Sequence, residues 1–315
     1  MNYHYRVVLF CVAVLTFFTS AGCSEQRVLE KLPDSVLEKV PDGVLLTAAE
    51  LSYEPFLKNE IGKQLTEHQG VAEPLYTEMH DRLSDYELVS LTVGQIGFSA
   101  IALKNTKDNS LLFAFSGLKK INLQDIYQRL IGFDSPENAS PVVVDAQAQQ
   151  AYKWVKQILN KKENTGASVY VTGHSFGGYL AQYIGYQLVQ DKNMKDHPFV
   201  QGVTFNSLGV LLDNGTKKLH TNTEKIQTLF KPIFTNYIVK GDPLDYASKT
   251  FFEEITGYSL QHLGNVNYIT VDENYKKSLQ ALEKTKDLWT KAKQLKPLYP
   301  YHDLAGFETH FWSVQ

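Results

Sequence analysis

The chain has 315 residues, of which 43% are hydrophobic and 21% charged, and its 20 glycines and 11 prolines are too few for a disordered or fibrous protein. Its 31 lysines and arginines stand against 34 aspartates and glutamates, so the composition does not favour nucleic acid as a partner. The sequence shows no break in composition after residue 44, and we predict one folded domain over residues 45–315.

Residues 1–22 are predicted to be a signal peptide. Arg6 precedes an apolar run over residues 7–18, which is too short to span a bilayer comfortably but has the length of a signal-peptide core. Small residues then lead to Cys23 in a segment that resembles a bacterial lipobox, with Ser20 where an aliphatic residue is usual. The resemblance implies export and lipidation of Cys23, as in an outer-membrane lipoprotein that faces the periplasm or the cell surface. Ordinary signal-peptidase cleavage beside Cys23 is the alternative.

Residues 23–44 form a segment of their own. They contain two copies of an eight-residue repeat, at 28–35 and 36–43, and each copy carries a proline that interrupts helix. One interpretation is a spacer between a lipidated terminus and the domain, with a reach of roughly 70 Å when extended. The other is that its valines and leucines pack on the domain. The second cysteine, Cys11, lies in the signal peptide, so no disulfide is expected in the mature chain.

From residue 45 onward, helical and strand-like segments alternate along the chain. In chain order they are helices at 46–52 and 76–86, strands at 87–92, 98–104 and 111–116, a helix at 141–161, a strand at 167–172, a helix at 180–189, strands at 200–205, 234–240 and 266–271, and a helix at 272–295. The middle strands are nearly continuous apolar runs, which indicates a sheet covered on both faces. Strands separated by helices predict an α/β fold with a mainly parallel central sheet flanked by helices.

The segment Gly173-His174-Ser175-Phe176-Gly177 matches the pattern G-x-S-x-G between a predicted strand and a predicted helix. That setting is typical of a nucleophile elbow, because the turn strains the serine and needs small neighbours to admit the crossing backbone. Ser175 is therefore the candidate nucleophile. A glycine-rich turn with a structural serine is the alternative.

Two blocks of the sequence resemble the class 3 lipases. Residues 171–182 are similar to the elbow of that family, with Phe176 in place of leucine, and residues 112–118 are similar to its strand that ends in F-R-G-S or F-R-G-T. In this second block Ser116 replaces arginine and Leu118 replaces serine or threonine. The resemblance implies an α/β-hydrolase fold, carboxylic ester hydrolysis and an oxyanion hole made by the backbone amides of Leu118 and Phe176. It also implies a lid over residues 122–133, for which an ordinary packed helix is the alternative.

The acid of a serine hydrolase on this fold follows the nucleophile in the chain and precedes the histidine. Asp242 ends a predicted strand, and Asp242-Pro243-Leu244 resembles the family's D-P-V element. Asp245 and Asp213 are the alternative acids.

Three histidines follow Asp242 and could supply the base. His302 is favoured because the sequence around it resembles the family's H-x-L-x-x-Y/F pattern, and His310 is the alternative. His262 resembles a non-catalytic H-x-G segment. His174 is expected to support the elbow, and the strand end at 203–207 is assigned to packing.

The sequence thus predicts a serine hydrolase that cleaves carboxylic esters of lipids through Ser175, His302 and Asp242 and an acyl-enzyme. Its partners would be a lipid or small ester and, through Cys23, a membrane. No histidine pair has metal-binding register and no glycine loop suits a phosphate, so neither metal nor cofactor is expected. Two alternatives are an acyltransferase or thioesterase on the same scaffold, and a tethered binding protein with a decayed hydrolase fold, which the altered residues Ser116 and Leu118 would favour.

Overall fold

The computed structural model describes residues 38–56, 58–68, 70–93, 99–117, 142, 146–213 and 216–312. The predicted signal peptide, Cys23, the repeat up to residue 37, Leu118 and the lid segment 122–133 lie outside these ranges. In the described part of the chain, every helix is too short or too polar to span a lipid bilayer.

The described elements follow the predicted alternation of helices and strands. The strands are β1 (Tyr86–Val93), β2 (Ser99–Asn105), β3 (Leu111–Phe115), β4 (Val169–His174), β5 (Phe199–Phe205), β6 (Leu211–Asp213), β7 (Phe234–Val239), β8 (Ser259–Gln261) and β9 (Asn265–Ile269). The α-helices are α2 (Asp42–Leu51), α3 (Leu75–Leu83), α5 (Ala146–Leu159), α6 (Phe176–Gln190), α7 (Lys217–Phe230), α8 (Pro243–Tyr246), α9 (Phe252–Thr256), α10 (Tyr275–Lys284), α11 (Leu288–Gln294) and α12 (Ala305–Trp312). Shorter helical turns are η1 (Lys58–Glu60), η2 (Leu65–Glu67), η3 (Lys162–Asn164), η4 (Lys192–Met194), η5 (Ala247–Phe251) and η6 (Lys296–His302).

Seven of the described strands form one sheet in the order β1-β2-β3-β4-β5-β7-β9. The pairs β1–β2 and β2–β3 are antiparallel, whereas β3–β4, β4–β5, β5–β7 and β7–β9 are parallel. Strands β6 and β8 pair separately as a small antiparallel sheet. The chain therefore has the α/β-hydrolase type of fold expected from its sequence, with a mainly parallel central sheet. Because parallel strands end at the same edge, the residues that follow β4, β5 and β7 lie near one another.

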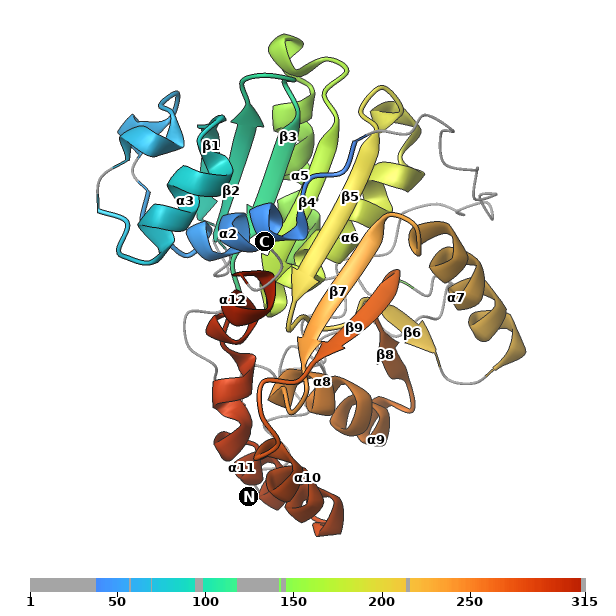
Figure 1. Cartoon of the computed structure of the whole chain (residues 1–315). Helices are drawn as coiled ribbons and strands as arrows, with labels where there is room; N and C mark the ends of the chain where they lie inside the picture. The colour runs from blue at the N-terminus through green and yellow to red at the C-terminus, as the bar shows by residue number, and fades with distance from the viewer. Residues whose placement is uncertain are drawn as a thin grey trace, which may run out of the picture. The chain divides into compact units, whose positions relative to one another are not determined.

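Helices cover both faces of this sheet (Figure 1). On the face that carries α2, α3 and α12, the fully buried Leu45 and Leu46 belong to one core with Val203 and Phe205 of β5. On the opposite face, where α5 and α6 lie, the Trp154 ring of α5 packs edge-on against phenylalanines of β3. The double cover explains why β3, β4 and β5 are apolar along their whole length.

The N-terminal part of the described chain runs lengthwise along β4. Alternate residues of a strand point to the same face, and three such residues of β4 hold the segment around α2. The contacts join the Tyr170 hydroxyl to the Glu38 carbonyl (2.7 Å), the Thr172 hydroxyl to the Leu45 carbonyl (2.9 Å) and the His174 ring to the Tyr53 hydroxyl (2.7 Å). Residues 38–44, the end of the repeat segment, thus pack on the domain.

The prediction of one helix over residues 272–295 is wrong. The structure has two helices, α10 and α11, separated at Thr285, which adopts an extended conformation (φ −90°, ψ 123°). The Thr285 hydroxyl bonds to the Ala281 carbonyl and to the Gln294 side chain, and the Asp287 side chain accepts from the Thr290 amide at the start of the next helix. These polar side chains compete with the helical backbone and end the first helix.

Candidate active site

Ser175 lies at a sharp turn between β4 and α6. Its backbone has φ 59° and ψ −127°, a strained conformation for a residue with a side chain. Glycines make this turn possible, because a Cβ on Gly177 would lie 2.1 Å from the Phe115 carbonyl oxygen and one on Gly173 would lie 2.4 Å from the Gly177 carbonyl oxygen. The local structure is thus that of a nucleophile elbow.

His302 and Asp242 form a buried hydrogen-bonded pair, with 2.5 Å between His302 Nδ1 and Asp242 Oδ2. His302 is 3% exposed and Asp242 2%, so water competes little with this contact. Asp242 follows β7 and its other oxygen accepts the Asp245 amide, which caps α8. Burial raises the pKa of the Asp242 carboxyl, and the charge and hydrogen bond of His302 oppose that rise.

The alternative acids have other partners. Asp245 forms an ion pair with Lys249 at 2.8 Å, and Asp213 accepts from His220 at 2.7 Å beside the small sheet. Among the aspartates that the sequence offered as acids, Asp242 is the one that the structure joins to His302.

The alternative histidines lie in other surroundings. His262 is buried 3.4 Å from the Ser207 hydroxyl, and burial together with the charge of Lys249 lowers its pKa to about 3. His310 packs against the rings of Tyr237 and Phe311.

Two backbone carbonyls hold the end of η6, the helical turn that carries His302. The carbonyl of His302 itself bonds to His174 Nε2 at 2.7 Å, and the carbonyl of Tyr301 accepts from Asn206 Nδ2 at 2.9 Å. Asn206 follows β5 with φ 44°, and its side-chain oxygen accepts the Val239 amide at 2.8 Å. The sequence assigned this strand end to packing, whereas in the structure Asn206 also holds the end of η6 through the Tyr301 carbonyl. The available signal was an asparagine directly after a buried strand, because asparagine tolerates positive φ.

A hydrogen-bonded chain runs from Gly117 through Tyr53 to His174. The Gly117 amide donates to the Tyr53 hydroxyl at 2.8 Å, and that hydroxyl lies 2.7 Å from His174 Nδ1. Burial and the nearby charge of His302 lower the pKa of His174 to about 3. Tyr53 belongs to no motif, and reasoning from the sequence did not identify it.

The loop after β3 lies directly against the elbow. A Cβ on Gly117 would lie 2.6 Å from the Cβ of Ser175, so only glycine fits this approach. Leu118, the next residue, lies outside the described part of the chain, and Phe176 is the first residue of α6. Gly117 and Ser175 are thus in close contact, and the residues expected to supply the oxyanion amides, Leu118 and Phe176, directly follow them in the chain.

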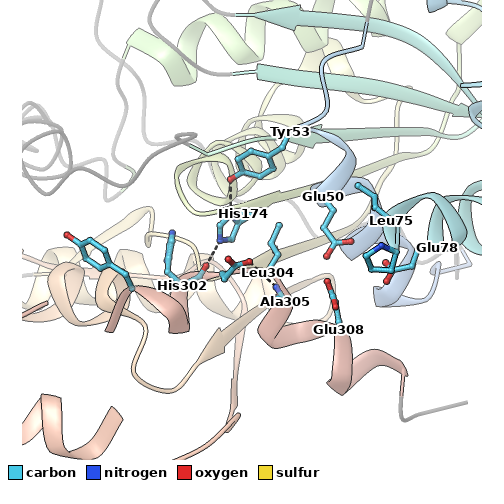
Figure 2. Close-up of a pocket in the computed structure, with 12 residues that line it drawn as sticks. Glu50, Tyr53, Leu75, Glu78, His174, His302, Leu304, Ala305 and Glu308 are labelled. Atoms are coloured by element: carbon cyan, nitrogen blue, oxygen red, sulfur yellow. Dashed lines mark hydrogen bonds between the residues drawn. The ribbon is translucent and has the colours of Figure 1, made fainter. Parts of the chain in front are cut away.

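A cavity of about 430 Å³ adjoins His302 (Figure 2). Tyr53, His174 and His302 line one side of it, with Leu304 and Tyr299 nearby. Its other side carries the carboxyl groups of Glu50, Glu78 and Glu308, and Asp303, next to His302 in the chain, also lines the cavity. A reacting group held in this cavity would lie beside the imidazole of His302.

Comparisons with known proteins agree with this fold. The model of the family described as Lipase (class 3) matches residues 123–244, a stretch that includes Ser175 and Asp242. No curated protein matches the sequence. Among solved structures, the fold is similar to M37 lipase, with a TM-score of 0.51, 13% identity and coverage of 88% of this chain and 100% of that one. It is also similar to the Rhizomucor miehei lipase propeptide complex, with a TM-score of 0.50, 15% identity and coverage of 72% of this chain and 67% of that one.

Proposed function

We infer that the chain is a carboxylic ester hydrolase similar to the class 3 lipases, whose family model matches residues 123–244, and we propose that it cleaves lipid esters with Ser175 as nucleophile, His302 as base and Asp242 as the acid that orients the base. The observation that carries the proposal is the buried contact between Asp242 and His302, at the sheet edge where Ser175 also lies. A carboxylate on Nδ1 fixes the neutral tautomer in which Nε2 is the basic nitrogen.

The reaction proceeds through an acyl-enzyme. His302 Nε2 takes the proton from Ser175 Oγ as this oxygen attacks the ester carbonyl carbon, and the negative charge passes to the carbonyl oxygen. The amides of Leu118 and Phe176 stabilise that oxyanion. The imidazolium then gives its proton to the departing alcohol. Water, deprotonated by the same nitrogen, attacks the acyl carbon and releases the carboxylic acid and the free serine.

The proposed substrates are acyl glycerols or phospholipids, and small esters are also expected to react. This proposal is supported by the family match and by the cavity beside His302. It follows that p-nitrophenyl esters of graded chain length are suitable probes, because they report acyl-chain preference without requiring the natural headgroup.

Replacement of the nucleophile tests the proposal. We expect Ser175→Ala in the full chain to lower ester hydrolysis by at least about a thousandfold, because the serine acts as a unit with its base. A fluorophosphonate probe should label wild type and leave Ser175→Ala unlabelled. Ser110→Ala, which removes a buried hydroxyl at the amino end of β3, is the control and should keep both properties. Equal hydrolysis and labelling in wild type and Ser175→Ala would contradict the mechanism, and acyl transfer to added alcohols in preference to water would favour an acyltransferase.

We also propose that the chain is exported and acylated at Cys23, which would place it in the cell envelope. The support is the apolar segment followed by small residues and a cysteine. A Cys23→Ala variant should then move from the membrane fraction to the soluble fraction of cells. Membrane association that is unchanged in this variant would contradict the proposed anchor.

A further inference from the structure

We propose that the Tyr53 hydroxyl is a positioning group that connects Gly117, the residue before the expected oxyanion amide, to η6, the helical turn that ends at the proposed base His302, an inference that rests on the proposed function. One oxygen atom contacts both parts of the site: it accepts from the Gly117 amide and bonds to His174, whose other ring nitrogen bonds to the His302 carbonyl. Figure 2 shows Tyr53, His174 and His302 joined in this order.

The donor and the acceptor can be assigned in each of the hydrogen bonds that link Gly117, Tyr53, His174 and His302. A carbonyl oxygen can only accept, so His174 Nε2 must carry the proton that it shares with His302, at 2.7 Å. A neutral ring then accepts at Nδ1, and the Tyr53 hydroxyl must be the donor in that bond. Because its proton is used there, the tyrosine oxygen is an acceptor for the Gly117 amide. Every donor has one acceptor, and the direction of each bond is fixed by its neighbour.

The fold brings Tyr53 to this place because α2 lies along β4. Glu38 lies at the second residue of β4, Leu45 at the fourth and Tyr53 at the sixth, so the segment reaches the catalytic edge just after α2 ends. The Tyr53 amide donates to the Glu50 carbonyl at 3.1 Å, and the tyrosine ring packs on the His174 ring with centroids 5.8 Å apart. The hydroxyl is thus held by the backbone behind it as well as by its partners.

Two consequences follow for catalysis. The Gly117 amide donates to Tyr53 and is therefore not available to an oxyanion. His174 stays neutral, since burial lowers its pKa to about 3, and this matters because its ring centroid lies 4.8 Å from that of His302. A second cation at that distance would oppose the imidazolium that forms at His302 during the reaction.

The test is Tyr53→Phe in the full chain, with p-nitrophenyl butyrate as substrate. We expect kcat to fall about ten- to a hundredfold while KM changes less than about twofold, because oxyanion stabilisation and base orientation act in the transition state. Tyr170→Phe is the matched control, since it removes the hydroxyl of another buried tyrosine, bonded to the Glu38 carbonyl at the far end of β4. Its kcat should stay within about twofold of wild type.

Three outcomes would overturn the inference. They are an unchanged kcat in Tyr53→Phe, an equal loss in both tyrosine variants, and a rise in KM with kcat preserved, which would indicate direct substrate binding. If wild type showed no ester hydrolysis that depends on Ser175, the proposed function itself would be overturned. The two failures are therefore distinguishable.

The protonation of His174 can also be measured in the wild-type chain. Nitrogen-15 spectra of the chain labelled at its 9 histidines should show His174 as a neutral ring with its proton on Nε2 and no titration between pH 5 and 9. Assignment by comparison with His174→Gln identifies the signal. A proton on Nδ1, or an imidazolium at pH 6, would contradict the assigned direction of the Tyr53 bond.

Discussion

Glu50 is a carboxyl group whose surroundings favour the protonated form. It lies at the end of α2 on the wall of the cavity, close to Glu78 and Glu308. Burial, followed by the charge of Glu78, raises the pKa of Glu50 from 4.5 to about 9. The folded chain therefore binds a proton here over a pH range in which the unfolded chain has released it. Folding stability must fall as pH rises through that range.

We expect Glu50→Gln to remove this loss. The advantage of the variant over wild type in unfolding free energy should grow between pH 5 and 9, by on the order of 2 kcal/mol, because the amide stays neutral. Urea unfolding at a series of pH values measures the effect. Glu283→Gln, on an exposed position of α10, is the control and should follow wild type. Parallel curves for wild type and Glu50→Gln would contradict the raised pKa.

The residues of the candidate site differ in how far the sequence predicts their arrangement. The sharp turn at Ser175 and the pairing of Asp242 with His302 could be predicted, because each residue stands in a local pattern and because chain order on this fold is fixed. Tyr53 and Asn206 could not, since each acts through a contact with a residue more than ninety positions away. Such contacts arise only when α2 packs along β4 and when the end of η6 packs against the residue that follows β5.

At the scale of elements, the elbow works because α6 begins where β3 and β4 end. Its first turn lies so close to β3 that the Phe115 carbonyl leaves no room for a side chain on Gly177. The contacting atoms are backbone, which cannot move aside as a flexible side chain can. The geometry of the nucleophile therefore depends on a close contact between a helix and a neighbouring strand.

We expect Gly177→Ala to destabilise the fold by about 2–4 kcal/mol, the cost typical of severe overpacking. Gly43→Ala is the matched control in α2, where the added methyl group would meet only the end of the Arg82 side chain at 3.2 Å. That variant should be neutral or more stable by up to about 1 kcal/mol, because alanine favours helix. Thermal unfolding of both variants decides the matter, and equal midpoints would show that the elbow can relax.

Elements with a strong local signal were predictable, and those formed by long-range pairing were not. The strands β3, β4, β5 and β7 are apolar in themselves, and their prediction agrees with the structure to within a few residues. Strands β6 and β8 have three residues each and exist because they pair across some fifty positions. The break between α10 and α11 depends on side-chain bonds of Thr285 that a charge pattern does not reveal.

At the scale of the whole molecule, two buried histidines couple stability to acid. The pKa values of His174 and His262 are both lowered to about 3, chiefly by burial. The unfolded chain takes up protons on these rings below about pH 6.5, whereas the folded chain does not until near pH 3. Stability from this source is complete above pH 6.5 and is lost as pH falls toward 3.

We expect His262→Asn to weaken this acid dependence by about one proton, or about 1.4 kcal/mol per pH unit between pH 6 and 4. Asparagine keeps a group able to bond to Ser207 but cannot titrate. Unfolding free energies measured in urea at pH 4, 5, 6 and 8 give the slope, and the value at pH 8 corrects for any packing loss. An identical slope in the variant would place the acid dependence on other residues.

The course of α2 along β4 also separates the start of the described chain from the candidate site. Glu38 and Lys39 bond to Tyr170 and Pro232 at the amino ends of β4 and β7, whereas Ser175 and Asp242 follow the carboxyl ends of the same two strands. The described chain therefore begins at one edge of the sheet and carries the candidate nucleophile and acid at the opposite edge.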